Sequence, residues 1–330
     1  MANSDDVYNT LGVTNSSATP LPSNQLDRVF MPTETIVQSA LTCASWLSVK
    51  GCFALEAIGA GLNSNFSTAL LGSLAGAFAG AFTAQRIAER SKRREEFSKE
   101  LRSVNAAIMV SASICNAVIA VKGQHVKPLL EKFNSDEAAR LEFDSQRETG
   151  ERQGNVGFQY VADLRLFPCP TLPISTLQDL VFNRLTIAGR SLSLVAVLTQ
   201  SITEMAQAFE KRKSIVETFR DGTVPESEIP YHYFGMRLSS GHTNREYPDI
   251  VSALSSYADD CIFFSSLLCE DLMSHGHRVR AEFEKKLGKG APKISQADFA
   301  AVRESGMLPP PSKYGDWLRG FPEQPESAAP

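Results

Sequence analysis

Residues 57–85 read AIGAGLNSNFSTALLGSLAGAFAGAFTAQ, and residues 86–102 read RIAERSKRREEFSKELR. The first stretch has no charged side chain over 29 positions, whereas the second has seven Lys and Arg. Its most apolar part, Phe66–Ala84, is 19 residues long. A helix of that length rises about 28 Å, close to the roughly 30 Å hydrocarbon core of a bilayer. The pattern predicts one transmembrane helix with a basic collar on its C-terminal side.

Three glycines are spaced four residues apart inside this span, at Gly72, Gly76 and Gly80. On a helix they form one smooth face, a doubled G-x-x-x-G motif. Such a face is unfavourable in water, since each glycine in a helix interior loses about 1 kcal/mol relative to alanine. In lipid it allows two helix backbones to approach closely. We therefore expect this face to pair spans of a homo-oligomer.

The basic residues predict the orientation of the span. The collar begins with Arg86, Arg90, Lys92, Arg93 and Arg94, whereas Lys50 is the one basic residue within about 20 positions upstream. The positive-inside rule then places the C-terminal domain in the cytoplasm and the N-terminus outside, in the plasma (inner) membrane. The collar is also suited to anionic lipid headgroups.

Two alternatives concern the membrane region. Phe66–Ala84 is rich in Ala and Gly, so it also fits the core helix of a soluble protein. The uncharged segment Thr35–Val49 is only 15 residues long, and we interpret it as an interfacial or packed helix rather than a second span. Residues 1–30 lack the basic start and apolar core of a signal peptide, which leaves an inverted topology of the span as an alternative.

Composition limits the possible functions. The chain has 330 residues, a formal charge of −4 and 43 % hydrophobic residues, enough for one sizeable domain besides the span. The negative charge argues against a general nucleic-acid binder. Six cysteines include no C-x-x-C pair and fit reduced, mostly buried side chains.

The pattern after the span predicts a mainly α protein. Three segments have apolar residues at alternating three- and four-residue spacing, which is typical of long helices packed as an antiparallel bundle or coiled coil. We expect a disordered polar tail over 1–34, a membrane region over 35–85, a cytoplasmic bundle over 86–288 and a Pro-rich tail over 289–330. The three stripes are Phe97, Leu101, Val104, Ile108, Ser111, Cys115 and Val118; Val195, Leu198, Ile202, Met205 and Phe209; and Tyr247, Val251, Leu254, Ala258, Cys261, Ser265, Leu268, Leu272, His275 and Val279.

Smaller features complete the predicted fold. Residues 158–166 alternate apolar and polar side chains, which suggests a strand, with residues 228–238 as its partner in a small two-stranded element. The first bundle helix is expected to end near Phe133, where Asn134–Asp136 resembles a stop and a new cap, and Pro128 is a potential kink. Arg212 interrupts the second stripe.

No metal, cofactor or catalytic motif emerges from the sequence. His275 and His277 point in different directions on a helix, and His125 meets His275 only if the first and third bundle helices run parallel. There is no E-x-x-H pair, Walker loop, G-x-S-x-G or H-E-x-x-H motif. We expect no metal, no cofactor and no enzymatic activity.

These observations predict a single-pass membrane protein that acts by self-association or signalling through a cytoplasmic bundle, with the lipid bilayer, a second copy and an unidentified protein as partners. One alternative is a pore-forming or membrane-disrupting effector, for example in bacterial defence against phage. Another is an enzyme with a site in the connectors between helices, near Tyr231, His232, Tyr233 and His242. The last is a soluble helical adaptor.

Overall fold

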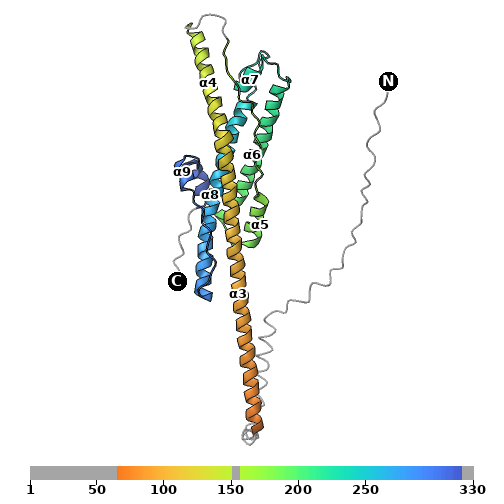
Figure 1. Ribbon diagram of the computed structural model, residues 1–330, viewed down its shortest axis with the longest axis vertical. Helices are drawn as coiled ribbons and strands as arrows, with labels where there is room; N and C mark the ends of the chain where they lie inside the picture. The colour runs from red at the N-terminus through yellow and green to blue at the C-terminus, as the bar shows by residue number, and fades with distance from the viewer. Residues whose placement is uncertain (1–64, 151–156, 322–330) are drawn as a thin grey trace, which may run out of the picture. The chain divides into compact units, whose positions relative to one another are not determined.

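The computed structural model describes residues 65–150 and 157–321, which are mainly helical and include no strand (Figure 1). The chain divides into two compact units, residues 1–84 and 85–330, each considered by itself below. The polar tail predicted over 1–34, the segment Thr35–Val49 and the end of the chain from residue 322 lie outside the described residues.

Helix α3 spans Asn65–Val121, a 57-residue stretch without proline. A single π-helical turn, Lys122–Val126, then leads directly into α4, Lys127–Glu148. Pro128 lies in the first turn of α4 and has no N–H for an α-helical hydrogen bond. The wider turn lets the helix continue past the proline instead of breaking.

The predicted end of this helix near Phe133 was wrong. Asn134, Ser135 and Asp136 all lie inside α4. Asp136 accepts a hydrogen bond from Lys132 one turn earlier, and Phe133 is buried. Side-chain packing and an i,i+4 ion pair therefore override the capping tendency of these residues.

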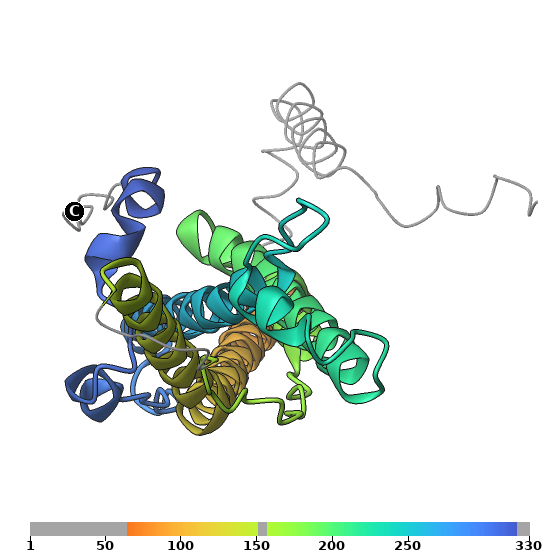
Figure 2. The same ribbon diagram turned by 90° about the horizontal axis from the view of Figure 1, so that it is seen from above.

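A three-helix bundle forms the core of the second unit. Helix α8, Glu246–Leu287, packs on α6, Arg190–Arg220, and on the continuous helical segment of α3 and α4 (Figures 1 and 2). The Ser111 hydroxyl donates to the carbonyl of Ser265 at 2.9 Å, and the Cys115 thiol lies 3.7 Å from the carbonyl of Ile262. The later residue on α3, Cys115, contacts the earlier residue on α8, Ile262, so the two helices are antiparallel.

The predicted stripes are the core of this bundle. All ten residues of the third stripe are buried on α8, and six of the seven residues of the first stripe are buried on α3, the exception being the half-buried Phe97. On α6 the residues of the stripe are buried except Ile202, which is half-buried. Helical-bundle packing is thereby confirmed. Since α3 and α8 are antiparallel, His275 lies against Glu100 of α3, and His125 stacks on Phe167 instead.

The predicted two-stranded element was wrong. Residues 157–166 have no regular secondary structure and pair with no strand among the described residues, and residues 229–234 form the short helix α7, Ile229–Phe234. Among the described residues, the bridge between Arg237 and Thr243 is the one β-type contact. Residues 157–167, which we call the strap, instead lie along the bundle. The alternation over 158–166 reflects the packing of alternate side chains of the strap against the core. Helix α5, Ile174–Arg184, follows the strap and packs on α6.

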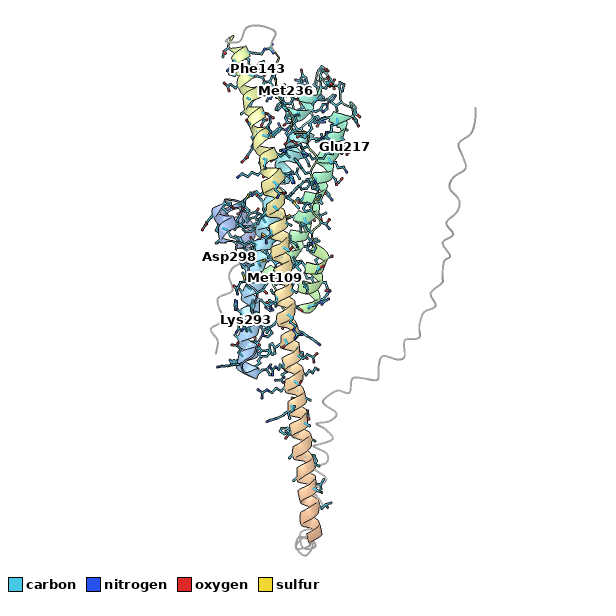
Figure 3. The ribbon with its side chains drawn as sticks, in the orientation of Figure 1. Met109, Phe143, Glu217, Met236, Lys293 and Asp298 are labelled. Carbon is cyan, nitrogen blue, oxygen red and sulfur yellow. The ribbon has the colours of Figure 1, made fainter. Side chains whose placement is uncertain are left out.

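The chain after Gly288 returns along the bundle (Figures 1 and 3). The side chain of Asn105 bonds the backbone on both sides of Ile294, donating to the carbonyl of Lys293 and accepting from the amide of Ser295, each at 2.8 Å. Three short helices follow: α9, Ala300–Glu304; a 3₁₀ turn, Pro311–Tyr314; and α10, Gly315–Arg319.

Candidate functional site

The first candidate site is the N-terminal part of α3. Four of its large apolar side chains follow one another at four-residue spacing and are exposed: Leu70 by 51 %, Leu74 by 47 %, Phe78 by 74 % and Phe82 by 57 %. Residues four apart lie on one side of a helix. The described part of residues 1–84 therefore presents a continuous apolar row with no charged residue in it.

The predicted glycine face lies on the other side of the same helix. Gly72, Gly76 and Gly80 are offset by two positions, about 200°, from the large apolar row. A Cβ atom added at any of the three would meet nothing within 4 Å. Packing within the described chain therefore does not require glycine at these positions.

Two hydroxyl groups in this stretch, those of Ser73 and Thr83, bond to the helix itself. The Ser73 hydroxyl donates to the carbonyl of Leu70 at 3.0 Å, and the Thr83 hydroxyl donates to the carbonyl of Ala79 at 2.7 Å. Such bonds satisfy the hydroxyl donors without water. These two side chains are thus compatible with an apolar environment.

A second charge-free stretch on the same helix, Ser103–Val121, lies in a different environment. Its apolar face is packed in the bundle, with Val104, Ile108 and Cys115 fully buried. Among the described residues one helical segment, Gly72–Glu148, is long and apolar enough to cross a membrane. It includes the end of the first charge-free stretch, from Gly72, and all of the second. Composition alone does not distinguish the two charge-free stretches. Their exposure does, because the large apolar side chains of the first are exposed and those on one face of the second are buried.

All five predicted collar residues, Arg86, Arg90, Lys92, Arg93 and Arg94, are exposed. The Arg90 guanidinium donates to the carbonyl of Leu287 at 3.2 Å, which satisfies one of the last carbonyls of α8. The collar is therefore exposed, and Arg90 joins it to the end of α8.

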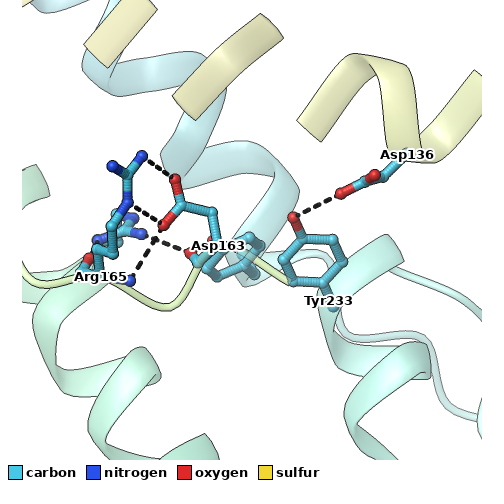
Figure 4. A network of polar contacts seen from close by, with 6 residues as sticks. Asp136, Asp163, Arg165 and Tyr233 are labelled. Atoms are coloured by element: carbon cyan, nitrogen blue, oxygen red, sulfur yellow. Dashed lines mark hydrogen bonds and ion pairs between the residues drawn. The ribbon is translucent and has the colours of Figure 1, made fainter. Parts of the chain in front are cut away.

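The second candidate site is the cluster where the strap and α7 meet over the bundle (Figure 4). Arg212 of α6 is only 2 % exposed and donates to the carbonyls of Arg165 at 2.7 Å and Asp163 at 2.9 Å. Its guanidinium lies 4.4 Å from the ring centre of Phe167. The arginine that interrupts the second stripe thus holds the strap in place through charge-assisted hydrogen bonds.

Two acidic side chains complete the polar part of this cluster. The Asp163 carboxylate accepts from Nε and the backbone amide of Arg165 at 2.9 and 3.1 Å, and this pairing holds the pKa of Asp163 below its usual range. The Tyr233 hydroxyl donates to Asp136 at 3.4 Å, and the Tyr247 hydroxyl donates to the carbonyl of Asp163 at 3.1 Å. The cluster therefore connects α4, α6, α7, α8 and the strap.

The chemistry of this cluster is that of packing rather than proton transfer. The ring of Tyr233 stacks on that of Tyr247 with 4.7 Å between ring centres and lies tilted against that of Tyr160 at 5.4 Å. Burial raises the pKa of all three phenols, that of Tyr160 to about 12, so they stay protonated near neutral pH. The adjoining depression of about 400 Å³ opens to solvent and is lined by Lys132 and residues 161–165.

The predicted connector residues are placed apart from the cluster centre. His232 on α7 lies 6.4 Å from Phe219 between ring centres, and Tyr231 is partly exposed. His242 lies in an exposed loop, where its carbonyl accepts from the amide of Leu238. Within the described residues, no hydrogen bond or ring contact joins Tyr231, His232 and His242 to one another. The neighbouring Tyr233 is the buried member, which a single sequence does not distinguish from Tyr231.

In the part of the chain that the structure describes, no group of three or more His, Cys, Asp or Glu side chains is placed to hold a metal ion. The buried thiols Cys115 and Cys269 have a pKa raised by burial, to about 11 and about 12. They therefore remain protonated and unreactive near neutral pH.

Comparison with known proteins gives no further assignment: no family model, no curated protein and no solved structure matches this chain.

Proposed function

We propose that this chain is a single-pass membrane-anchored helical protein that acts by self-association or signalling through a cytoplasmic bundle. The observation that carries the proposal is the charge-free part of α3 with its exposed apolar row. Transfer of a large apolar side chain out of water is worth roughly 1.5–3 kcal/mol, and a bilayer provides that transfer for every residue of the row. The hydroxyl groups of Ser73 and Thr83 donate to carbonyls of their own helix, which is also compatible with the apolar interior of a bilayer.

The orientation and location follow from the collar. Its basic residues are exposed, as headgroup-facing residues must be, and they follow the apolar stretch directly in α3. By the positive-inside rule the bundle is cytoplasmic and the N-terminus lies outside the plasma (inner) membrane.

Self-association is assigned to the glycine row. No contact within the described chain accounts for glycine at these three positions, and each lowers helix stability relative to alanine. Close approach of a second span is the physical setting in which their small size is favourable. The span of a second copy is the partner that we propose.

The test of the anchor is extraction of cell membranes with alkaline carbonate and then with detergent. The full chain is expected to resist carbonate and to dissolve in detergent. A double variant, Leu74→Lys with Phe78→Lys, is expected to lose carbonate resistance, since a lysine at the centre of a span costs about 2.5–3.5 kcal/mol.

The matched control is Ala106→Lys with Met109→Lys. These residues lie on α3 too, in the second charge-free stretch, and both are exposed. The control is expected to remain carbonate-resistant. Release of the unaltered chain by carbonate, or equal loss in both variants, would overturn the proposal and favour a soluble helical adaptor.

A further inference from the structure

The antiparallel packing of α8 on α3 brings a second basic segment next to the collar. Phe97 of α3 and Phe283 of α8 are 6.2 Å apart between ring centres, and the Lys286 ammonium lies 5.5 Å from the ring centre of Phe97. The hydrogen bond from Arg90 to the carbonyl of Leu287 places the end of α8 beside Arg90 of α3. Residues 285–290 therefore lie beside residues 90–97, although almost 200 positions separate them in the sequence.

The two segments together are strongly basic. Residues 85–102 contain seven Lys and Arg and four Glu, and residues 278–293 contain six Lys and Arg and two Glu. Their net charge is +7, whereas the rest of the chain carries −11, since the whole chain carries −4. Such a separation of charge on one protein is suited to a partner that is an extended anionic surface.

The basic residues differ in their level along α3. Arg94 is eight residues past Arg86, about 12 Å along the helix. Gly276 packs against Val104, which is 18 residues past Arg86, about 27 Å along the helix. Electrostatic attraction in physiological salt extends about 8 Å beyond a charged surface. A membrane at the start of the collar therefore attracts the residues near Arg90, about 6 Å along the helix, most strongly. The attraction is weaker at Arg94, and the residues near Val104 are screened from it.

The geometry points to a composite docking surface for anionic phospholipid headgroups, formed by residues 86–94 of α3 and residues 285–289 at the end of α8. The inference rests on the proposed span, which sets the membrane beside Arg86. Lys285 and Lys289 are exposed, and their ammonium groups are suited to phosphodiester oxygens. The arginines supply bidentate contacts to the same groups. Contact through both α3 and α8 fixes the end of the bundle against the membrane.

The experiment uses the full chain in nanodiscs of phosphatidylcholine alone or with one quarter phosphatidylglycerol. The preference for a spin-labelled phosphatidylglycerol over spin-labelled phosphatidylcholine is measured from the motionally restricted fraction. Hydrogen exchange of the amides in residues 285–293 is measured in parallel. We expect a preference of several-fold and slower exchange with phosphatidylglycerol, both weakened by 0.5 M salt because the charges are screened.

Two double variants test the assignment to α8. Lys285→Gln with Lys289→Gln is expected to lower the lipid preference at least threefold, since each basic residue near an anionic surface contributes about fivefold. Arg278→Gln with Lys293→Gln removes the same charge from the same part of the chain, but Lys293 lies beside Asn105 and Arg278 is two residues past Gly276. This control is expected to keep the preference within a factor of about 1.5.

Equal effects of the two double variants, or no preference in the unaltered chain, would overturn the inference. So would binding of a labelled oligonucleotide that anionic lipid does not displace, because the surface would then be a nucleic-acid site. Carbonate extraction distinguishes the two proposals. Release by carbonate refutes the span, whereas carbonate resistance without lipid preference refutes the docking surface alone.

Discussion

Gly276 shows how one residue fixes the distance between three segments. A Cβ atom at this position would lie 2.9 Å from Cγ1 of Val104 and 3.1 Å from Cδ1 of Ile294. The first neighbour belongs to α3 and the second to the segment after α8. Glycine is therefore required by close packing, in contrast to the three glycines of the apolar stretch.

We predict that Gly276→Ala destabilises the bundle by about 1–3 kcal/mol through overpacking. Alanine is usually favoured over glycine inside a helix by about 1 kcal/mol, so the sign itself is informative. Urea unfolding of the detergent-solubilised chain, monitored by circular dichroism, measures the effect. Ser274→Ala on an exposed position of α8 is the control and is expected to change stability by less than 0.5 kcal/mol. Stabilisation by Gly276→Ala would contradict the packing described here.

Asp163 provides a prediction about pH. Its pKa is lowered by the hydrogen bonds from Arg165, so it stabilises the folded state above its unfolded pKa of about 3.9 and loses that contribution as the pH falls through its folded pKa. The unaltered chain is expected to be more stable than Asp163→Asn at pH 7, and the difference is expected to narrow below about pH 4. Urea midpoints of both proteins between pH 7 and pH 3 provide the comparison. A difference that is constant with pH would show that the carboxylate charge is unimportant.

At the scale of elements, α3 carries two charge-free stretches with different packing. The bundle stretch buries one face against α8, whereas the N-terminal stretch exposes its apolar row. The π-helical turn before Pro128 lets the helical segment continue as α4 to Glu148. Asp136 of α4 accepts a hydrogen bond from Tyr233. One long helical segment thus supplies the proposed span, the collar and one wall of the connector cluster.

We predict that Gly76→Leu lowers self-association of the full chain in bilayers at least tenfold, because the new side chain separates the two glycine rows. Energy transfer between differently labelled copies at varied lipid dilution measures the association. Ala81→Leu is the control, since Ala81 lies about 140° from the centre of the glycine row, on the side of Leu74. Unchanged association in the glycine variant would refute the proposed pairing face.

At the scale of the whole bundle unit, the segment after Gly288 covers apolar surface of α8. Tyr314 stacks on Phe263 with 3.8 Å between ring centres, and its hydroxyl donates to Asp260 at 2.7 Å. Trp317 packs edge-on against Phe264 at 5.1 Å. Residues 289–330, whose prolines are typical of an extended tail, thus contribute Tyr314 to the core of the bundle.

We predict that deletion of residues 309–330 exposes Phe263 and Phe264, lowers the melting temperature by several degrees and increases binding of a hydrophobic dye. Thermal unfolding and dye fluorescence of the detergent-solubilised chain measure the two effects. Deletion of residues 322–330 alone is the control, because Tyr314 and Trp317 are retained. A truncated chain with unaltered stability would show that the aromatic contacts contribute little.

The sequence by itself determined the three long bundle helices and their buried faces, although not where the first one ends, because the spacing of apolar residues repeats with the helix and requires no knowledge of the partner. It also determined the charge-free stretch and the basic collar. The direction in which α8 packs on α3, and with it the second basic segment, was decided only by tertiary structure. So was the strap, since alternation over 158–166 fits a strand equally well until Arg212 is placed beneath its carbonyls. Contacts between residues 50 to 200 positions apart leave no periodic trace in a single sequence, and they decide which segments meet.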